Sequence, residues 1–264
     1  MRFGCCGSMV AMKPDGTGIE IIEQLEEIGY DYIELSLAHL MALPELEFLK
    51  IKERIFSLGI NCEVCNNFFP PYLKLTGNEI DTLKIEAYVR KSIEMAGQLG
   101  VKIIVFGSGS AKNVPDGFSK DKAWEQLIAI LKYINEIAKR YNILIAIEPL
   151  RKTECNIVNS IQEGLNLVKD VNRSNIKLLA DFYHMSIEEE DFKVLVKARN
   201  YIIHVHFAKV EGRVFPKEIN EDNYISFISK LKQIGYNERV SIEAYSKDFY
   251  KDAVISLKFL KKIF

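Results

Sequence analysis

This sequence has neither an excess of charge of one sign nor a long apolar run. Its 35 Lys and Arg residues balance 36 Asp and Glu residues, which gives a formal net charge of −1. Such a chain has no overall field that would attract nucleic acid or anionic lipid. No segment approaches the length of a membrane-spanning helix, and the first residues, MRFGCCGSM, lack the basic and long apolar regions of a signal peptide. We therefore expect a cytoplasmic protein that binds neither nucleic acid nor membranes, with a small neutral or weakly charged ligand.

The cysteines do not form the pattern of a disulfide framework. There are five of them, an odd number, which agrees with a reducing compartment. Cys62 and Cys65 have C-x-x-C spacing, but they lie in NCEVC, which is typical of a strand. Because residues three apart in a strand point to opposite faces, we predict buried packing for this pair and no redox or zinc chemistry.

Linkers rich in Pro and Ser and low-complexity tracts are also absent. Hydrophobic residues make up 48% of the chain, which is ample material for a core. We therefore predict one domain that covers residues 1–264.

Eight short runs of β-branched and aromatic residues alternate with longer helical patterns. Most of these runs are continuously apolar, as expected for parallel strands that are covered on both faces. Glycines before several runs predict helix C-caps with positive φ, at Gly29, Gly59, Gly100 and Gly235. The predicted strands cover residues 2–6, 31–37, 60–65, 102–107, 143–148, 176–181, 201–207 and 239–245.

Eight alternating strand and helix units in a chain of this length predict a (β/α)₈ TIM barrel, with eight parallel strands inside and helices outside. The alternative is an open, doubly wound sheet. No strand is followed by a G-x-G-x-x-G motif that opens a helix, which disfavours that alternative. The GSGS segment at 107–110 lacks the required spacing, and we predict a flexible turn there.

Ionisable residues stand at the carboxyl ends of the last four predicted strands, where a barrel places its active site. They are Glu148, Asp181, His206 and Glu243. For any one of them alone, a salt bridge or a capping role at a strand end explains its position at least as well as a metal ion does. Burial of all four without a shared partner would be costly, so together they predict one divalent metal ion.

The residue types of this set indicate the kind of metal. Three carboxylates and one imidazole suit Mn²⁺ or Mg²⁺, with Co²⁺ as a further option, and we expect Mn²⁺. Zinc is disfavoured because no thiolate is placed to join the set. His204 shares a strand face with His206, one pleat deeper, and is the alternative histidine ligand.

Further polar residues lie close to these positions in the sequence. His184 follows Asp181 by three residues and is predicted to orient a hydroxyl or carbonyl group of a substrate beside the metal. Arg213 is predicted either to reach a substrate oxygen or phosphate, or to be a solvated loop charge. Glu154 is predicted to pair with His184 or to bind a terminal hydroxyl group. His39 stands alone after the second predicted strand, and we expect no functional role for it.

Several segments together resemble the sugar phosphate isomerase/epimerase family with the xylose-isomerase-like barrel. They are IEPLRKTECNIVNS, IKLLADFYHM, HVHFAKVEGR and SIEAY. Within that family the chain is most similar to the ketose 3-epimerases of the tagatose and psicose epimerase group. The resemblance implies metal ligands at Glu148, Asp181, His206 and Glu243, and substrate contacts at Glu154, His184 and Arg213.

The resemblance also implies a reaction. A ketose or ketose phosphate would be epimerised at carbon 3 through a metal-stabilised enediolate, with Glu148 and Glu243 as acid and base. Dehydration of a keto-inositol and isomerisation of hydroxypyruvate or of an aldose to a ketose are alternatives on the same site. A non-catalytic sugar-binding barrel is less favoured. So is an abasic-site endonuclease, which needs a zinc cluster and more than the 4 histidines present. Related barrels often form dimers or tetramers, so a homodimer or homotetramer is expected.

Overall fold

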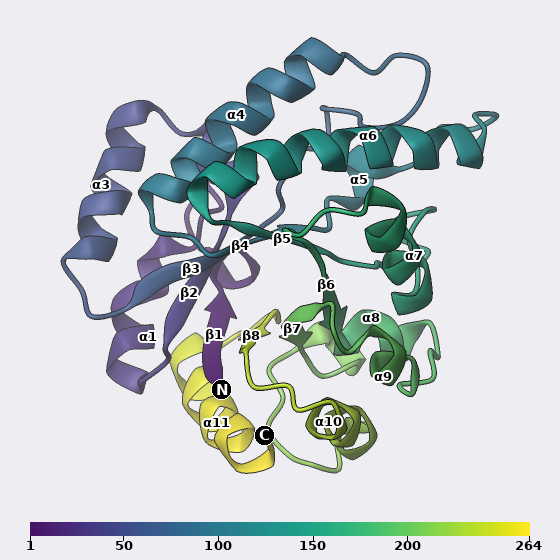
Figure 1. The fold of residues 1–264 in the computed structure, drawn as a ribbon. Coiled ribbons are helices and arrows are strands. Elements are labelled where there is room, and N and C mark those ends of the chain that lie inside the picture. Colours follow the sequence, from purple (N-terminus) through teal and green to yellow (C-terminus); the bar gives the residue numbers. More distant parts are fainter.

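A closed barrel of eight parallel strands forms the centre of the molecule, in the order β1 to β8 (Figure 1). The computed structural model describes residues 1–264. Each strand pairs with its sequence neighbours, and β8 pairs with β1 to close the barrel. The strands are β1 (Arg2–Cys6), β2 (Tyr32–Ser36), β3 (Asn61–Asn66), β4 (Ile103–Phe106), β5 (Leu144–Ile147), β6 (Ile176–Asp181), β7 (Ile202–Phe207) and β8 (Arg239–Ile242). The predicted fold class is therefore confirmed.

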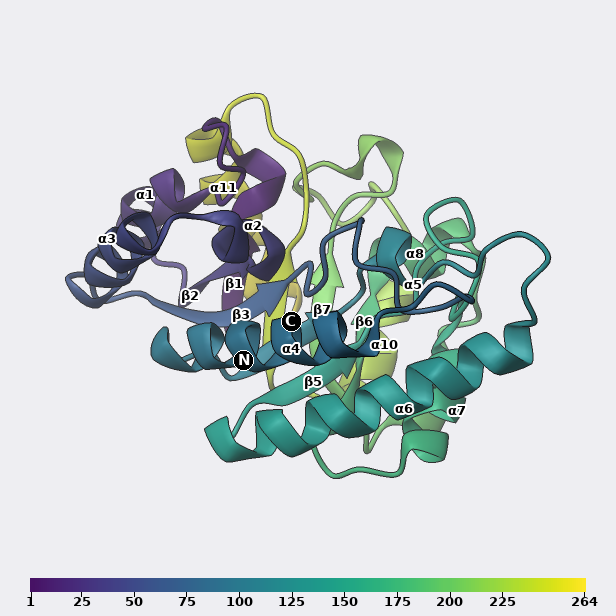
Figure 2. The same cartoon turned by 90° about the horizontal axis from the view of Figure 1, so that it is seen from above.

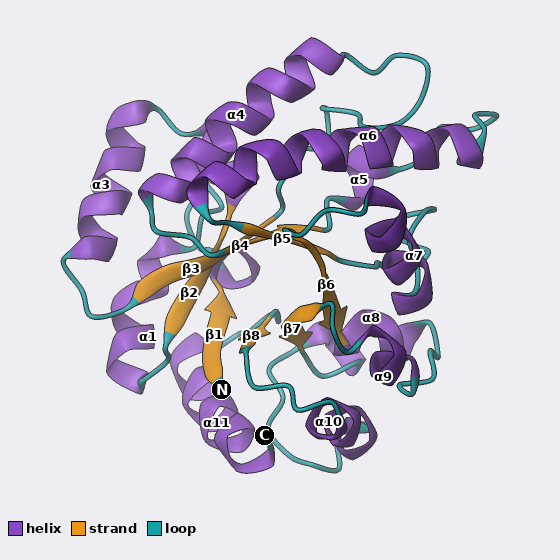
Figure 3. Ribbon diagram, in the orientation of Figure 1, coloured by secondary structure: helices purple, strands orange, loops and turns teal.

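Helices surround this barrel, as two views that differ by a 90° turn show (Figures 2 and 3). In chain order the α-helices are α1 (Ile22–Ile28), α2 (Leu37–Ala42), α3 (Glu45–Phe56), α4 (Thr82–Gln98), α5 (Gly109–Lys112), α6 (Lys120–Ala138), α7 (Ile161–Val171), α8 (Phe182–Ile187), α9 (Val194–Ala198), α10 (Tyr224–Gln233) and α11 (Phe249–Ile263). Short 3₁₀ turns are η1 (Gly7–Val10), η2 (Ile19–Ile21), η3 (Lys139–Tyr141) and η4 (Glu211–Arg213). None of the helices combines the length and the apolar character that crossing a membrane requires.

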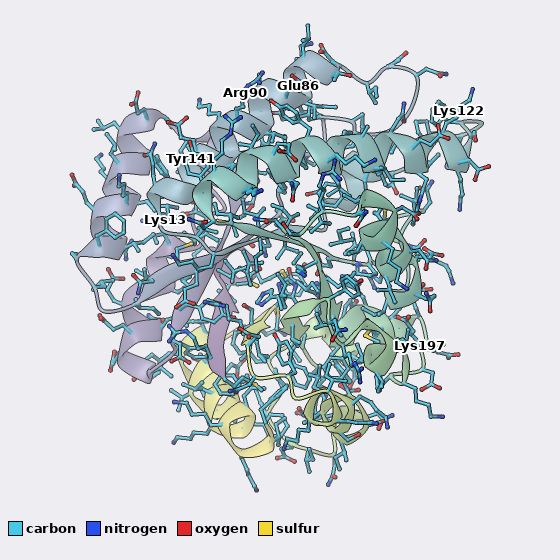
Figure 4. All side chains as sticks on the ribbon, viewed as in Figure 1. Lys13, Glu86, Arg90, Lys122, Tyr141 and Lys197 are labelled. Atoms are coloured by element: carbon cyan, nitrogen blue, oxygen red, sulfur yellow. The ribbon has the colours of Figure 1, made fainter.

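Charged side chains are abundant on the outer helices (Figure 4). Glu86 and Arg90 form an ion pair of 3.6 Å on α4, and Lys197 on α9 is exposed. Such pairs on the surface contribute little to stability. Ionisable groups inside the barrel are therefore the exceptions that need an explanation.

Hydrophobic side chains form two separate clusters, one on each face of the sheet. The larger cluster of 77 buried residues lies mainly between the strands and the helices. The smaller cluster consists of six buried residues on alternate strand positions that point into the barrel, Tyr32, Val64, Ile103, Val105, Ala146 and Leu179. Toward the carboxyl ends of the strands, polar side chains replace these apolar ones.

The amino end of the barrel is closed by an ion cluster. Glu63 in β3 accepts hydrogen bonds from Arg2 in β1 and from Arg239 in β8, the latter at 2.6 Å. Its side chain is largely buried, whereas the Arg2 side chain is half exposed. The cluster links β3 to the mutually neighbouring strands β1 and β8, far from the carboxyl ends.

A bulge at Glu63 overturns one prediction about the cysteines. Ile33 pairs with Cys62 but Glu34 pairs with Val64, so Glu63 is an extra residue in β3. As a result Cys62 and Cys65 both belong to the outer cluster, and the prediction that they point to opposite faces is wrong. Both are free, fully buried thiols, so the prediction of buried packing is confirmed.

The predicted glycine caps are found at three of four positions. Gly29, Gly100 and Gly235 follow helices and have φ values of 93°, 79° and 70°. The prediction for Gly59 is wrong. Helix α3 ends earlier, at Phe56, and Ser57 closes it with φ −81°, so the chain turns before it reaches Gly59.

The close approach of β1 and β2 inside the barrel gives a test of the packing. A Cβ atom at Gly4 would lie 2.2 Å from the Tyr32 ring, which is fully buried. We expect Gly4→Ala to lower the free energy of unfolding by about 1–3 kcal/mol, as overpacking typically does. Chemical denaturation followed by circular dichroism measures this change.

Gly59→Ala is the matched control. Gly59 does not have a positive φ, and an added Cβ would meet only the flexible end of Glu26. We expect a change within about 0.5 kcal/mol. Equal stability of the two variants would contradict the packing described for the barrel interior.

Candidate metal centre

Four ionisable side chains meet at the carboxyl end of the barrel. Glu148 directly follows β5, Asp181 ends β6, His206 lies in β7 and Glu243 directly follows β8. Each offers one ligand atom, and these atoms lie within 4.8 Å of one another. All four residues are buried. The side chains that the sequence pattern singled out are thus brought together, in an arrangement that can hold a metal ion.

The Nδ1 atom of His206 lies in the middle of this group. It is 2.9 Å from Glu148 Oε1, 3.2 Å from Glu243 Oε2 and 3.9 Å from Asp181 Oδ2. Three buried carboxylates this close together repel one another unless positive charge lies among them. A divalent cation would supply that charge.

Asp181 gives the clearest indication that the residues fit a metal ion. Its Oδ1 atom accepts hydrogen bonds from the backbone N–H groups of Tyr183 and His184, at 2.6 Å and 3.1 Å, and so caps α8. Its Oδ2 atom is buried and has no hydrogen-bond partner. An unpartnered buried carboxylate oxygen is costly, and it is what a cation site requires. The donor set of three carboxylates and one imidazole suits a hard cation.

The two histidines of β7 occupy different layers. His206 presents Nδ1 to the carboxylates, whereas His204 lies deeper in the barrel, with the ring centroids 5.0 Å apart. His204 Nε2 is 3.0 Å from Glu34 Oε2, and its Nδ1 has no partner. Of the two alternatives, the geometry therefore favours His206 as the ligand.

Arg213 brings a fixed positive charge to the group. Its Nη2 atom donates to Glu243 Oε2 and is 3.7 Å from Asp181 Oδ2. Its Nη1 atom is 3.7 Å from Glu154 Oε1, and the guanidinium lies over the Tyr183 ring at 4.6 Å. With a side chain only 13% exposed, Arg213 is not a solvated loop charge.

His184 and Glu154 border the centre in different ways. His184 is buried, its Nδ1 accepts from the Arg151 backbone N–H at 3.3 Å, and its Nε2 is 3.6 Å from Asp181 Oδ2. Since Nδ1 accepts, Nε2 carries the proton and can donate toward the centre. Glu154 pairs with Arg151 at 2.7 Å and with Arg213, and it makes no contact with His184. Of the two predicted roles of Glu154, pairing with His184 is thus not observed.

The charges of this group shift one another's protonation. Burial raises the pKa of Glu148 above its ordinary value, against the opposing charge of His206. Burial acts on Glu243 too, but His206 and Arg213 outweigh it and lower the pKa of Glu243 to about 2. Burial disfavours the charged form of His206, yet Glu243 and Glu34 raise its pKa well above the ordinary value. The group therefore attracts positive charge, as a proton on His206 or as a metal cation.

The segment at 107–110, predicted as a flexible turn, is instead part of the support of Glu148. A Cβ atom at Gly107 would lie 2.2 Å from Glu148 Oε2, so this position leaves room for the carboxylate. Residues 109–112 form helix α5, and the fully buried Lys112 donates from Nζ to the Glu148 carbonyl oxygen at 3.0 Å. Sequence reasoning missed Lys112, because nothing in its loop marks it as buried.

Two further polar residues at the centre were also missed. Glu34 lies within β2 and contacts His206 Nε2 at 2.9 Å. Asn66 ends β3, donates to Glu243 Oε1 at 3.3 Å and leaves its own Oδ1 atom buried without a partner. A signal existed for Glu34, since it is the one charged residue in the strand YIELS, but it does not stand at the end of the predicted strand.

A hollow of about 250 Å³ lies between the loops that follow β2, β3 and β4. Two of its lining residues, Asn67 and Ser108, directly follow Asn66, which donates to Glu243, and Gly107, which leaves room for Glu148. The remaining lining residues are Ser36, Ala38, His39, Phe69, Pro71, Gly109, Ser110 and Ala111. The hollow thus presents hydroxyl and amide groups and carries neither Lys nor Arg.

A match between the chain and known sequences agrees with this geometry. The sequence pattern of the xylose isomerase-like TIM barrel family matches residues 22–263. The chain belongs to this family. The resemblance drawn from its sequence motifs is therefore confirmed.

Two kinds of enzyme are found among the named relatives of this chain. The D-psicose 3-epimerase of Ruminiclostridium cellulolyticum is 24% identical over 230 residues, which cover 85% of this chain and 77% of that protein. The inosose isomerase of Bacillus licheniformis is 28% identical over 248 residues, with 87% and 84% covered. Among solved structures, D-psicose 3-epimerase with D-tagatose from Clostridium cellulolyticum H10 has a TM-score of 0.86 at 20% identity, with 100% of this chain and 99% of that chain covered. A likeness at this identity shows the shared fold alone.

Asp181→Asn separates the capping and metal-binding roles of Asp181. Asn caps helices about as well as Asp, so we expect the metal-free variant to remain folded with a similar unfolding midpoint. Mn²⁺ at 100 times its Kd should stabilise the unchanged protein by about 2.7 kcal/mol, and the variant should lose this gain. Thermal unfolding with and without MnCl₂ measures both.

Asp81→Asn is the control, because Asp81 caps α4 in the same way on the outer surface. It should keep the full response to Mn²⁺. If Asp181→Asn also kept that response, Asp181 would have to be removed from the ligand set.

Proposed function

We propose that this chain is a divalent-metal-dependent isomerase that epimerises a ketose, or a ketose phosphate, at carbon 3. The observation that carries the proposal is the convergence of Glu148 and Glu243 on one atom, His206 Nδ1, at 2.9 Å and 3.2 Å. Relatives named as ketose 3-epimerases and inosose isomerases support the reaction class. We propose Mn²⁺ as the ion, with Mg²⁺ or Co²⁺ as alternatives, held by Glu148, Asp181, His206 and Glu243.

When bound, the cation would polarise the sugar carbonyl and stabilise the negative charge that develops on the sugar oxygens. His184 would add a hydrogen bond from Nε2 to that oxygen, since its other ring nitrogen already accepts from the backbone. Arg213 would donate to a neighbouring hydroxyl group, and Glu154 would hold the guanidinium in place. These contacts would fix the sugar in one orientation before the proton moves.

Inversion at carbon 3 requires proton transfer on both faces of the sugar. The C3–H bond breaks on one face, its electron pair is delocalised toward the carbonyl oxygen, and a new C3–H bond forms on the opposite face. Glu148 follows β5 and Glu243 follows β8, which are not neighbours in the barrel. We propose that one carboxylate accepts the proton while the other, in its protonated form, returns one. The two residues exchange roles in the reverse direction.

The hollow beside the centre supports a polyol as the remainder of the substrate. Its Ser36, Asn67 and Ser108 offer hydroxyl and amide groups. Such groups are suited to sugar hydroxyls, whereas a phosphate group is usually bound with the help of Arg or Lys. Of the two substrate classes proposed, this favours an unphosphorylated ketose.

Isomerisation of a keto-inositol is the second candidate. Relatives named inosose isomerase reach 28% identity, slightly more than those named D-psicose 3-epimerase. A proton beside a carbonyl would be removed here too, so the same carboxylates would serve. A homodimer or homotetramer stays a prediction for either function.

A substrate panel in D₂O distinguishes these reactions. We expect a ketohexose or ketopentose, with Mn²⁺, to yield its C3 epimer with one deuterium at the inverted carbon, as seen by NMR. If only keto-inositols were turned over, the second candidate would be supported and ketose epimerisation rejected. A dehydration product would reject both candidates.

The two carboxylates can be tested by isosteric substitution. We expect Glu148→Gln and Glu243→Gln each to lower kcat by about 10²- to 10⁴-fold, because each removes an acid–base group. Steady-state kinetics on the substrate found in the panel measures this loss, with circular dichroism to confirm the fold.

Glu94→Gln, an exposed substitution on α4, serves as the control and should keep the full rate. Near-normal turnover by Glu148→Gln or Glu243→Gln would exclude that carboxylate from proton transfer.

A further inference from the structure

A buried carboxylate lies beneath the metal centre, on the side of His206 that faces away from it. Glu34 Oε1 is 2.9 Å from His206 Nε2, while the other ring nitrogen, Nδ1, is 2.9 Å from Glu148 Oε1. Both Glu34 and His206 are fully buried. The imidazole is thus held between a carboxylate below and the proposed metal ligands above.

We propose that Glu34 is a positioning residue that fixes the tautomer and orientation of His206 and thereby strengthens metal binding. The inference rests on the metal centre of the proposed function. A neutral imidazole has one N–H group, and a carboxylate can only accept. With the proton on Nε2 and donated to Glu34, the lone pair of Nδ1 faces the metal. A carboxylate behind a histidine ligand also makes that ligand more basic.

Glu34 is itself held rigidly, which a positioning role requires. Its Oε2 atom accepts from Ser241 Oγ at 2.6 Å and is 3.0 Å from His204 Nε2. Tyr32 Oη lies 2.9 Å from the same Ser241 hydroxyl group. These residues come from β2, β7 and β8 and are fully buried. Both oxygens of Glu34 are occupied, so its carboxylate cannot rotate freely.

The sheet geometry explains why Glu34 reaches His206. Tyr32 belongs to the apolar cluster inside the barrel, and Glu34, two residues further along β2, shares its face of the strand. The Arg2 and Arg239 side chains are bound to Glu63 at the amino end. Glu34 therefore adds a further negative charge below the three carboxylates of the centre.

A competing assignment makes Glu34 a ligand. Cys6, Glu34 and His206 also lie close enough together to hold an ion. That ion would have to displace the contacts that Glu34 makes with His206, Ser241 and His204. The number of Mn²⁺ ions bound per chain therefore separates a positioning role from a ligand role.

The test measures Mn²⁺ affinity without any sugar, from the electron paramagnetic resonance signal of free Mn²⁺. We expect one ion per chain, and an affinity lowered about 10- to 100-fold in Glu34→Ala, as is typical for such partners of a histidine ligand. Glu34→Gln should lose less Mn²⁺ affinity than Glu34→Ala. Its amide oxygen can still accept from Nε2–H, although the negative charge is gone. With diamagnetic Mg²⁺ bound, the ¹⁵N shifts of His206 should show a hydrogen-bonded proton on Nε2 in the unchanged protein, and the Nε2 shift should change in Glu34→Ala, which removes the acceptor.

Glu63→Gln is the matched control, because Glu63 is a largely buried carboxylate at the opposite end of the same barrel. It should lose stability but keep the Mn²⁺ affinity. An affinity of Glu34→Gln equal to that of the unchanged protein would overturn the inference, even if Glu34→Ala failed to fold. Two ions per chain, one of them lost in Glu34→Gln, would also overturn it.

The proposed function can fail separately from this inference. Mn²⁺ binding that depends on Glu34, in a protein that turns over neither ketoses nor keto-inositols, would support the role of Glu34 and reject the reaction. Absence of Mn²⁺ binding in the unchanged protein would reject the role of Glu34.

Discussion

Repulsion among buried carboxylates is the constraint on which the carboxyl end of this barrel depends. Glu148, Asp181 and Glu243 come within a few ångströms of His206 Nδ1, and all four residues are buried. Such charges are tolerated only where positive charge is shared among them. Arg213 supplies part of it, and a divalent cation would supply the rest. In the proposed function, a sugar bound at this end of the barrel would lie between two carboxylates.

Stability and function are separated along the barrel axis. The amino end is closed by Glu63 with Arg2 and Arg239, and the apolar cluster above it fills the interior. Polar side chains then accumulate toward the carboxyl end. Because each strand points its alternate residues inward, one strand can contribute both to the packing below and to the chemistry above. In β2, Tyr32 belongs to the apolar cluster, and Glu34 contacts His206.

Relatives with different names match this chain over most of its length, so we propose that the loops above the barrel determine the choice of substrate. The loops after β2, β3 and β4 form a hollow of about 250 Å³. The proposed metal centre lies on the other side, on β5 to β8. This division lets the loops vary while the centre keeps its geometry. It also explains why family membership indicates the class of chemistry better than the sugar.

The sequence by itself determined the barrel and the four residues of the proposed centre. Alternating strands and helices lead to parallel strands, and parallel strands in a barrel bring their carboxyl ends together, so residues such as Glu148 and Asp181 can be recognised from their places alone. Only the tertiary structure decided that Glu34 and Lys112 are buried beside this group. Their burial depends on contacts between strands and loops distant in the chain, and the bulge at Glu63 depends on pairing that no local pattern specifies.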